Sequence, residues 1–202
     1  SESVAQKLAD LAYREPDVHV RSQLAASARR LPAAQALPII KNLAQRSEDT
    51  DDIHIPLLLW WAIESKADAD RDAVLELFED KAFWDQPLVA KHLTERLMRR
   101  YAATGKHKDL LTAARLLELA PSKEHATRLM AGLEAAYEGR TIANLPVELA
   151  AAMAKAGATS PTVRLRQGDQ AAVAQALTII ADDKADAAKR QQLVAVFGTI
   201  NQ

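Results

Sequence analysis

Four of the five histidines recur at a nearly regular interval and are the first candidates for chemistry. His19, His54, His92 and His125 are separated by 35, 38 and 33 residues. Imidazole binds metals and titrates near neutral pH, so a histidine ladder along one face would form a metal or pH-sensitive site. Packed helices at this interval, however, lie about 10 Å apart, which is long for shared coordination. We therefore predict no metal site, and expect His19 and His54 to bond neighbouring carbonyl groups.

The tryptophan pair Trp60-Trp61 is a second candidate, because indole rings stack on bases and sugars. Adjacent residues of a helix point about 100° apart, so the two rings cannot share one surface. We expect at least one of them in the core. Phe83 and Trp84 stand at an expected helix start, where we interpret them as a hydrophobic staple.

Charge is strongly segregated along the chain, although the formal net charge is only −1. Residues 48–80 carry a net charge of −9, and residues 91–128 carry +5. The basic cluster within the second stretch consists of Arg96, Arg99, Arg100, Lys106 and Lys108. Its arginines have the 3–4 spacing of one helix face. The interpretation that we favour is a solvated helix face balanced by neighbouring acids. The alternative hypothesis is that this cluster is an interaction patch for an acidic partner domain or a polyanion.

Signatures of enzymes are missing from the sequence. It contains no phosphate-binding loop, no His-Glu-x-x-His, no Gly-x-Ser-x-Gly and no cysteine. We predict no catalytic, cofactor-binding or metal-ligating residue, and hence no enzyme activity in this segment. The longest apolar run, residues 55–63, is too short for a membrane span of roughly 20 residues. The near-neutral charge gives no general attraction to nucleic acid, and we expect none as a partner.

Helix-forming residues dominate the whole length, and the signals of strands and hairpins are nearly absent. Five prolines, at positions 16, 56, 87, 121 and 161, recur at intervals of 40, 31, 34 and 40 residues. Proline suits the first turn of a helix, where its missing N–H leaves no bond unmade. This spacing of the prolines predicts a repeated helix pair of about 36 residues.

Similar short sequence motifs support the predicted repeat. Residues 17–21 resemble residues 52–56, and residues 15–21 resemble residues 160–166. In each motif, a short polar residue precedes a predicted helix that starts with an apolar–polar–apolar pattern. We therefore expect the side chains of Asp17 and Asp52 to cap these helices. The predicted helices cover residues 2–14, 17–31, 33–47, 53–66, 69–80, 85–104, 107–120, 122–138, 145–156, 161–167, 169–182 and 185–200.

Segment 53–63 is apolar on nearly every side, so we expect a helix covered on both flanks, as at the centre of a stack. Most predicted helices are too short for the heptad seams of the alternative, a compact bundle. We predict an all-α fold, a right-handed α–α superhelix (a HEAT-like solenoid) of about five to six helix pairs. It would form one domain over residues 1–202, which we interpret as a fragment of a larger multidomain protein because no initiator Met is present.

The word Asp-x-x-Val-Arg at residues 17–21, followed by Ala- and Leu-rich helices, resembles HEAT repeats over nearly the whole chain. Residues 16–27, 54–64 and 166–169, with 189–190 and 197–198, resemble more closely the HEAT region of planctomycete-type membrane-bound dehydrogenases. In that family, a sugar-dehydrogenase-like propeller precedes the HEAT repeats, and a c-type cytochrome domain follows them. The resemblance implies a secreted or periplasmic location. It implies no redox residue here, because this chain holds neither propeller nor haem motif.

Two main functional hypotheses remain. The first is a non-catalytic scaffold that binds neighbouring domains of the same secreted polypeptide or another protein. The second is a HEAT-like DNA glycosylase for alkylated bases, which would use Trp60, Trp61, Asp52 and the basic cluster. The acidic stretch around the tryptophans would repel phosphate, which argues against this second hypothesis. A chaperone-like lyase or a cofactor-loading protein is a third possibility, which no specific residue supports.

Overall fold

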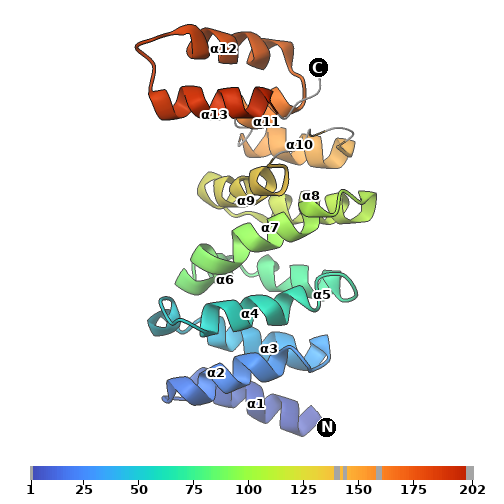
Figure 1. Cartoon of the computed structure of the whole chain (residues 1–202). Coiled ribbons are helices and arrows are strands. Elements are labelled where there is room, and N and C mark those ends of the chain that lie inside the picture. Colours follow the sequence, from blue (N-terminus) through green and yellow to red (C-terminus); the bar gives the residue numbers. More distant parts are fainter. Residues whose placement is uncertain (1, 139–141, 143–144, 158–160, 199–202) are drawn as a thin grey trace.

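The protein is all-helical in the computed structural model, which describes residues 2–138, 142, 145–157 and 161–198. Of these described residues, 76% are helical, in 13 α-helices, and none lies in a strand. The helices succeed one another along an elongated stack, with α1 at one end and α12 and α13 at the other (Figure 1). The predicted all-α class is therefore confirmed.

The α-helices are α1 (Glu2–Arg14), α2 (Val18–Ala28), α3 (Ala33–Ala44), α4 (Ile55–Glu64), α5 (Arg71–Glu76), α6 (Lys81–Trp84), α7 (Thr94–Ala103), α8 (His107–Leu119), α9 (Lys123–Ala136), α10 (Val147–Ala156), α11 (Pro161–Arg166), α12 (Gln170–Ala181) and α13 (Ala187–Phe197). Two 3₁₀ turns, η1 (Ser47–Asp49) and η2 (Leu77–Glu79), and one π-helical turn, η3 (Val89–Leu93), complete the list.

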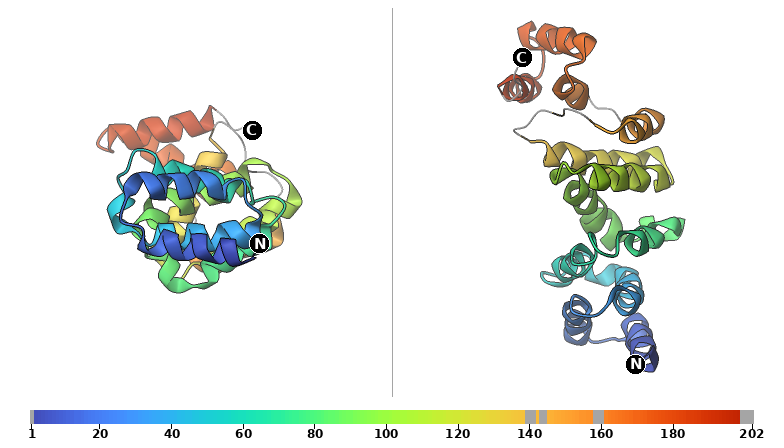
Figure 2. Two further views of the ribbon diagram at one scale, coloured as in Figure 1. Left: turned by 90° about the horizontal axis from the view of Figure 1, so that it is seen from below. Right: turned by 90° about the vertical axis from the view of Figure 1, so that its right-hand side faces the viewer.

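The first ten helices form two rows, seen most easily along the length of the stack (Figure 2). In one row α1 packs on α3, α3 on α5, and α8 on α10. In the other row α2 packs on α4, α4 on α7, and α7 on α9. In most of these contacts a helix lies against the next but one in the chain, whereas α4 lies against α7, with α5 and the short α6 between them in the sequence.

Two features around residue 85 differ from the predicted helix 85–104. The chain forms the short extra helix α6 first, because the Asp80 carboxylate caps it at the amide of Ala82 and its aromatic residues turn into the core. The next helix then begins at Pro87 and contains the π-helical turn η3 before α7. The π-helical turn holds one extra residue, which shifts the register of the helix. Neither the spacing of the prolines nor that of the apolar residues predicts such a shift.

The predicted cap at Asp17 is confirmed, because α2 begins at Val18. The predicted start of the next helix at residue 53 is two residues early, because α4 begins at Ile55 with His54 at its N-cap position. The Asp17 carboxylate accepts hydrogen bonds from the amides of His19 and Val20, at 2.8 and 3.2 Å. The Asp52 carboxylate accepts bonds from the amides of His54 and Ile55, both at 2.8 Å. The third word, at 160–166, has its first residue outside the described part, and Pro161 begins α11 as predicted.

Arg21, the arginine of the Asp-x-x-Val-Arg word, is buried and joins two turns of the chain. Its guanidinium donates to both carboxylate oxygens of Asp49 in η1, at 2.6 and 2.5 Å, and to the carbonyls of Glu15 and Pro16. Removing either member of such a buried pair leaves an uncompensated charge. The arginine of this motif therefore connects the start of α2 to the turn that follows α3.

A continuous apolar core runs from α1 to α11, and the aromatic residues concentrate at its middle. Trp84 is fully buried, donates its indole N–H to the carbonyl of Phe78 at 2.7 Å, and contacts the Phe78 ring edge-on. Phe83 packs edge-on against the same ring. These residues are core residues and not a staple at a helix start. Helices α11–α13 share a second, smaller core of Leu165, Ala176, Leu193 and Val196.

The expectation that segment 53–63 is covered on both flanks is wrong on one side. Leu59 and Ile63 of α4 are completely buried, but Leu57 and Trp61 on its outward face are 37% and 40% exposed. Trp60 is half-buried and packs against the core, so one tryptophan of the pair contacts the core as expected. The apolar outer face of α4 is thus not covered by any helix of the described residues.

Gly132 permits a close approach of two helices. It lies in α9 where that helix crosses α7, and a Cβ atom built on it would stand 2.1 Å from the carbonyl oxygen of Glu95. Backbone atoms cannot yield as a flexible side chain would. Only glycine therefore fits this crossing.

We predict that Gly132→Ala lowers the free energy of unfolding by about 1–3 kcal/mol, because α7 and α9 must separate. Helix propensity alone would favour the alanine by about 1 kcal/mol, so the sign of the change reports the contact. Urea unfolding followed by circular dichroism measures it. Gly198→Ala is the control, since its new Cβ would meet no atom closer than 3.5 Å. A stabilised Gly132→Ala variant would contradict the prediction.

Candidate functional site

The segregated charges of the sequence meet between successive helix pairs. The ion pairs that cross from one pair to the next are Lys41–Asp80 at 2.9 Å, Lys91–Asp51 at 2.5 Å, Arg71–Asp109 at 2.9 Å, Lys108–Asp68 at 2.8 Å and Arg115–Asp72 at 2.6 Å. Their members lie roughly one repeat apart in the sequence, so the acidic stretch neutralises the basic stretch of the next pair. Most of these residues are at the surface, where a single pair contributes little and a network contributes more.

The predicted basic cluster is divided by these pairs. Arg100 lies 3.6 Å from Glu64 of α4, and Lys108 pairs with Asp68. Arg96 is half-buried, and one of its terminal nitrogens has no hydrogen-bond partner within the described residues. Arg99 and Lys106 are exposed. The structure thus brings the three arginines together on α7 beside α4, and it places the two lysines at the start of α8.

Several carboxylates of this network have lowered pKa values. The hydrogen bond from Lys108 lowers the pKa of Asp68, that from Lys91 lowers the pKa of Asp51, and that from Lys41 lowers the pKa of Asp80. Backbone amide bonds lower the pKa values of the capping residues Asp17 and Asp52. All five carboxylates are therefore stabilised in their charged form by folding.

Arg71, Asp109 and Tyr101 form the most buried polar group of the network. Burial acts to raise the pKa of Asp109, but hydrogen bonds from the Thr104 hydroxyl, at 2.7 Å, and from Arg71 lower it overall. Burial raises the pKa of Tyr101 to about 12, and its hydroxyl has no hydrogen-bond partner within the described part of the chain. These groups stay in one protonation state near neutral pH and suit a structural role.

The histidines lie in successive helices of one row but do not converge. His92 contacts the carbonyl of Thr50 at 2.8 Å, which is the carbonyl bonding that we expected of His19 and His54. Both of those residues are exposed, and neither ring has a hydrogen bond within the described residues. His125 lies between the Ser122 hydroxyl and Asp85, 3.2 Å from the latter. The described residues hold no group of three or more potential ligands placed to bind a metal.

The residues required by the glycosylase hypothesis are also separated. Asp52 caps the start of α4 with its carboxylate, whereas Trp61 lies near the end of that helix. Trp61 lies six residues beyond Ile55, the first residue of α4, which corresponds to about 9 Å along the helix axis. Trp60 and Trp61 diverge, one toward the core and one toward solvent. These side chains therefore do not line one pocket together.

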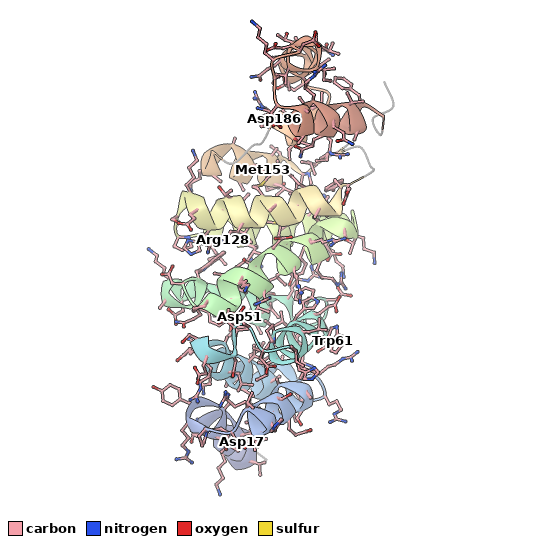
Figure 3. The ribbon with its side chains drawn as sticks, turned by 60° about the vertical axis from the view of Figure 1, so that its left-hand side comes forward. Asp17, Asp51, Trp61, Arg128, Met153 and Asp186 are labelled. Carbon is pink, nitrogen blue, oxygen red and sulfur yellow. The ribbon has the colours of Figure 1, made fainter. Side chains whose placement is uncertain are left out.

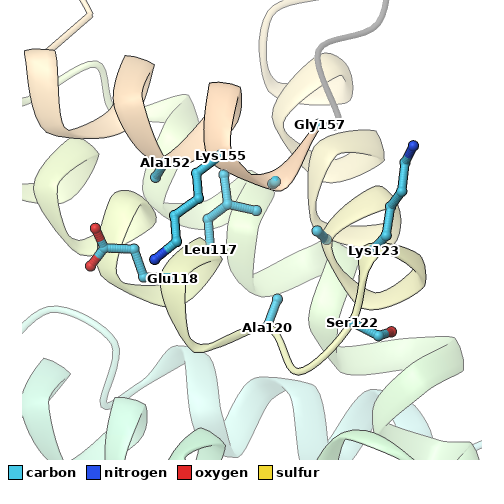
Figure 4. A pocket seen from close by; sticks show the side chains of 10 residues that line it. Leu117, Glu118, Ala120, Ser122, Lys123, Ala152, Lys155 and Gly157 are labelled. Carbon is cyan, nitrogen blue, oxygen red and sulfur yellow. The ribbon is translucent and has the colours of Figure 1, made fainter.

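A pocket of about 480 Å³ lies between the α8–α9 turn and the end of α10 (Figure 4). Alanines and Leu117 form much of its lining. The Lys155 side chain extends toward Glu118, and Lys123 points away from both. The polar groups do not converge on a common point, so the pocket has no arrangement suited to catalysis.

The outward face of α4 borders a groove with a different composition, which we call the α2–α4 groove. Its lining residues are Ala26, Arg29, Arg30, Leu58 and Trp61, and its volume is about 330 Å³. Trp61 stands at the edge of the stack (Figure 3). A surface that combines an exposed indole with two exposed arginines has the composition typical of protein-binding surfaces. This groove is our candidate functional site.

Sequence reasoning singled out Trp61 but missed Arg29 and Arg30. The dipeptide ends α2, and only the packing of α2 on α4 places it beside Trp61. One sequence signal was present: a repeat of about 36 residues places the end of α2 next to the end of α4.

Comparisons of the chain with protein families, with curated proteins and with solved structures found no match. Within the described residues, no helix combines the length and apolar character that crossing a membrane requires. The functional assignment therefore depends on the surface of the stack itself.

We predict that stability falls on acidification below about pH 4, the ordinary range for aspartate. Lowered pKa values mean that the unfolded chain binds protons more readily, so stability is present above the unfolded values and is lost as pH falls through the folded ones. The urea midpoint measured from pH 7 to pH 3 should be nearly constant at first and then decrease. The triple variant Asp51→Asn, Asp68→Asn, Asp80→Asn should show a shallower decrease. Greater stability at pH 3 than at pH 7 would refute the prediction.

Proposed function

We propose that this chain is a non-catalytic α–α superhelix of the HEAT type that binds a protein partner or a neighbouring domain. Most helices of the two rows pack on the next but one in the chain, which is the contact pattern expected of stacked helix pairs. The repeated motif with its buried arginine supports the HEAT class: Arg21 and its counterpart Arg166 are only 4% and 8% exposed. Such stacks bind partners through the extended surfaces that they leave exposed.

The observation that carries the proposal is the uncovered face of α4. Leu57 and Trp61 are four residues apart, so they lie on one side of a helix whose opposite side is completely buried. Folding gains little from these partly exposed side chains, whereas covering them would remove more apolar surface from water. Tryptophan at such a position is a frequent centre of protein–protein interfaces.

A photocrosslinking amino acid, benzoylphenylalanine, placed at position 57 tests the proposal in the cells that make the protein. We expect one or a few discrete crosslinked protein species. The same substitution at the exposed Tyr13 of α1, which is 62% exposed, is the control and should give none of these species. Equal, diffuse crosslinking from both positions, or none from position 57, would refute α4 as a binding face.

We also propose that the stack belongs to a larger secreted protein of the dehydrogenase type. The resemblance of residues 16–27 and 54–64 to the HEAT region of such proteins supports this assignment. The complete reading frame tests it. We expect a β-propeller before the stack and a Cys-x-x-Cys-His haem motif after it, and a frame with neither would contradict this part of the proposal.

A further inference from the structure

Building on the proposed function, we infer that the α2–α4 groove binds an acidic helical segment of a protein partner. One large apolar side chain of that segment would lie beside Trp61 and Leu58. Its carboxylates would pair with Arg29 and Arg30. The groove's shape, its apolar floor and its charge each support part of this inference.

The groove is held in place by bonds between the ends of α2 and α4. The ammonium group of Lys66, just beyond α4, donates to the carbonyl of Arg29 at 2.8 Å, and this lysine is buried. The hydroxyl of Ser65 lies 3.4 Å from the same carbonyl and donates its proton to the carbonyl of Ala62, at 2.8 Å. The backbone that carries both arginines is thus fixed relative to Trp61 before any partner binds, which reduces the entropic cost of binding.

The floor of the groove suits an apolar anchor. Trp61 is 40% exposed and Leu58 half-buried, and Leu57 extends the apolar surface by one helical turn. A partner helix that lays its apolar side chains into such a groove contacts it with residues three and four positions apart. The volume of about 330 Å³ accommodates one large side chain and part of its helical turn.

The charge of the groove selects for acidic residues. Arg29 and Arg30 are both exposed, and neither has an ion-pair partner within the described residues. Elsewhere in the stack the acids of one helix pair meet the bases of the next, and the carboxylate nearest in sequence to Trp61, Glu64, already lies beside Arg100. None of the lining residues is acidic. Guanidinium groups pair with carboxylates in two-bond geometry, so a partner with aspartate or glutamate beside its apolar anchor is complementary.

A nucleic acid is a poorer occupant for this site. The start of α4 carries Asp51 and Asp52, and Asp68 follows its end, so a polyphosphate chain lying along α4 would pass carboxylates. The formal net charge of −1 adds no long-range attraction. An isolated acidic helix, in contrast, needs to satisfy only the two arginines.

Nuclear magnetic resonance of the ¹⁵N-labelled chain provides the test, because its three tryptophans give separate indole N–H signals. The probe is a blocked helical peptide with leucine and phenylalanine on one face and glutamate on the other. We expect saturable movement of the Trp61 signal on titration. The Trp84 signal should stay in place, because that indole is buried and bonded to Phe78. Movement of both signals, or of neither, would overturn the inference.

Variants separate the two components of recognition. Trp61→Ala, and separately the double variant Arg29→Glu, Arg30→Glu, should each weaken peptide binding about tenfold or more, as loss of a central interface residue does. Tyr13→Ala and Arg14→Glu remove an exposed aromatic residue and an exposed arginine from α1, and they should leave affinity unchanged. Unaltered circular dichroism shows that each variant is folded. Equal weakening by both sets would contradict a specific groove.

Two competing probes fix the class of partner. The same peptide with lysine in place of glutamate should bind at least about tenfold more weakly, and equal affinity would overturn the charge assignment. A single-stranded oligonucleotide that moves the Trp61 signal at lower concentration than the acidic peptide would show that the partner is a nucleic acid and overturn the inference.

The outcome for this inference is distinguishable from that for the proposed function. If position 57 crosslinks a protein but the peptide does not bind, only the partner chemistry is wrong. If position 57 crosslinks no protein and the acidic peptide does not bind, the proposed interaction function itself is wrong.

Discussion

The helices of this protein bury their apolar sides against one another along an elongated stack, and the remaining features of the structure depend on that packing. The close approach of α9 to α7 is possible because Gly132 has no side chain to separate them. The aromatic cluster around Trp84 fills the middle of the core. A two-row stack of this kind leaves its outer faces to solvent, and those faces are where a partner can bind.

Electrostatics follows the same layering. The acidic stretch from 48 to 80 and the basic stretch from 91 to 128 are opposite in charge because one helix pair lies against the next. Lys108 and Arg100 of the basic cluster pair with acids of preceding helices, as expected of a helix face balanced by neighbouring acids. Among the described residues, Arg29 and Arg30 beside Trp61 have no such ion pair, and the groove that they line holds no acid.

Much of the helical layout was predictable, because its signals are local. Proline suits first turns, and Asp17 and Asp52 cap helices through amides two and three residues away. The short helix α6 and the π-helical turn η3 were missed, since their causes are the burial of Trp84 and Phe83 and a shift in register. Complete cover for α4 was predicted wrongly, since apolar spacing shows that a face is apolar and not whether another helix reaches it.

The sequence by itself determined the helical class, several of the helix starts and the charge segregation, because propensity, capping and spacing act over a few residues. Only the tertiary structure decided which charges neutralise one another, which tryptophan faces solvent, and that Arg29 and Arg30 stand beside Trp61. Those outcomes depend on how far α2, α4 and α7 rotate about their axes when they pack. That rotation results from the side-chain volumes of the whole core, so it cannot be predicted from any short stretch of the sequence.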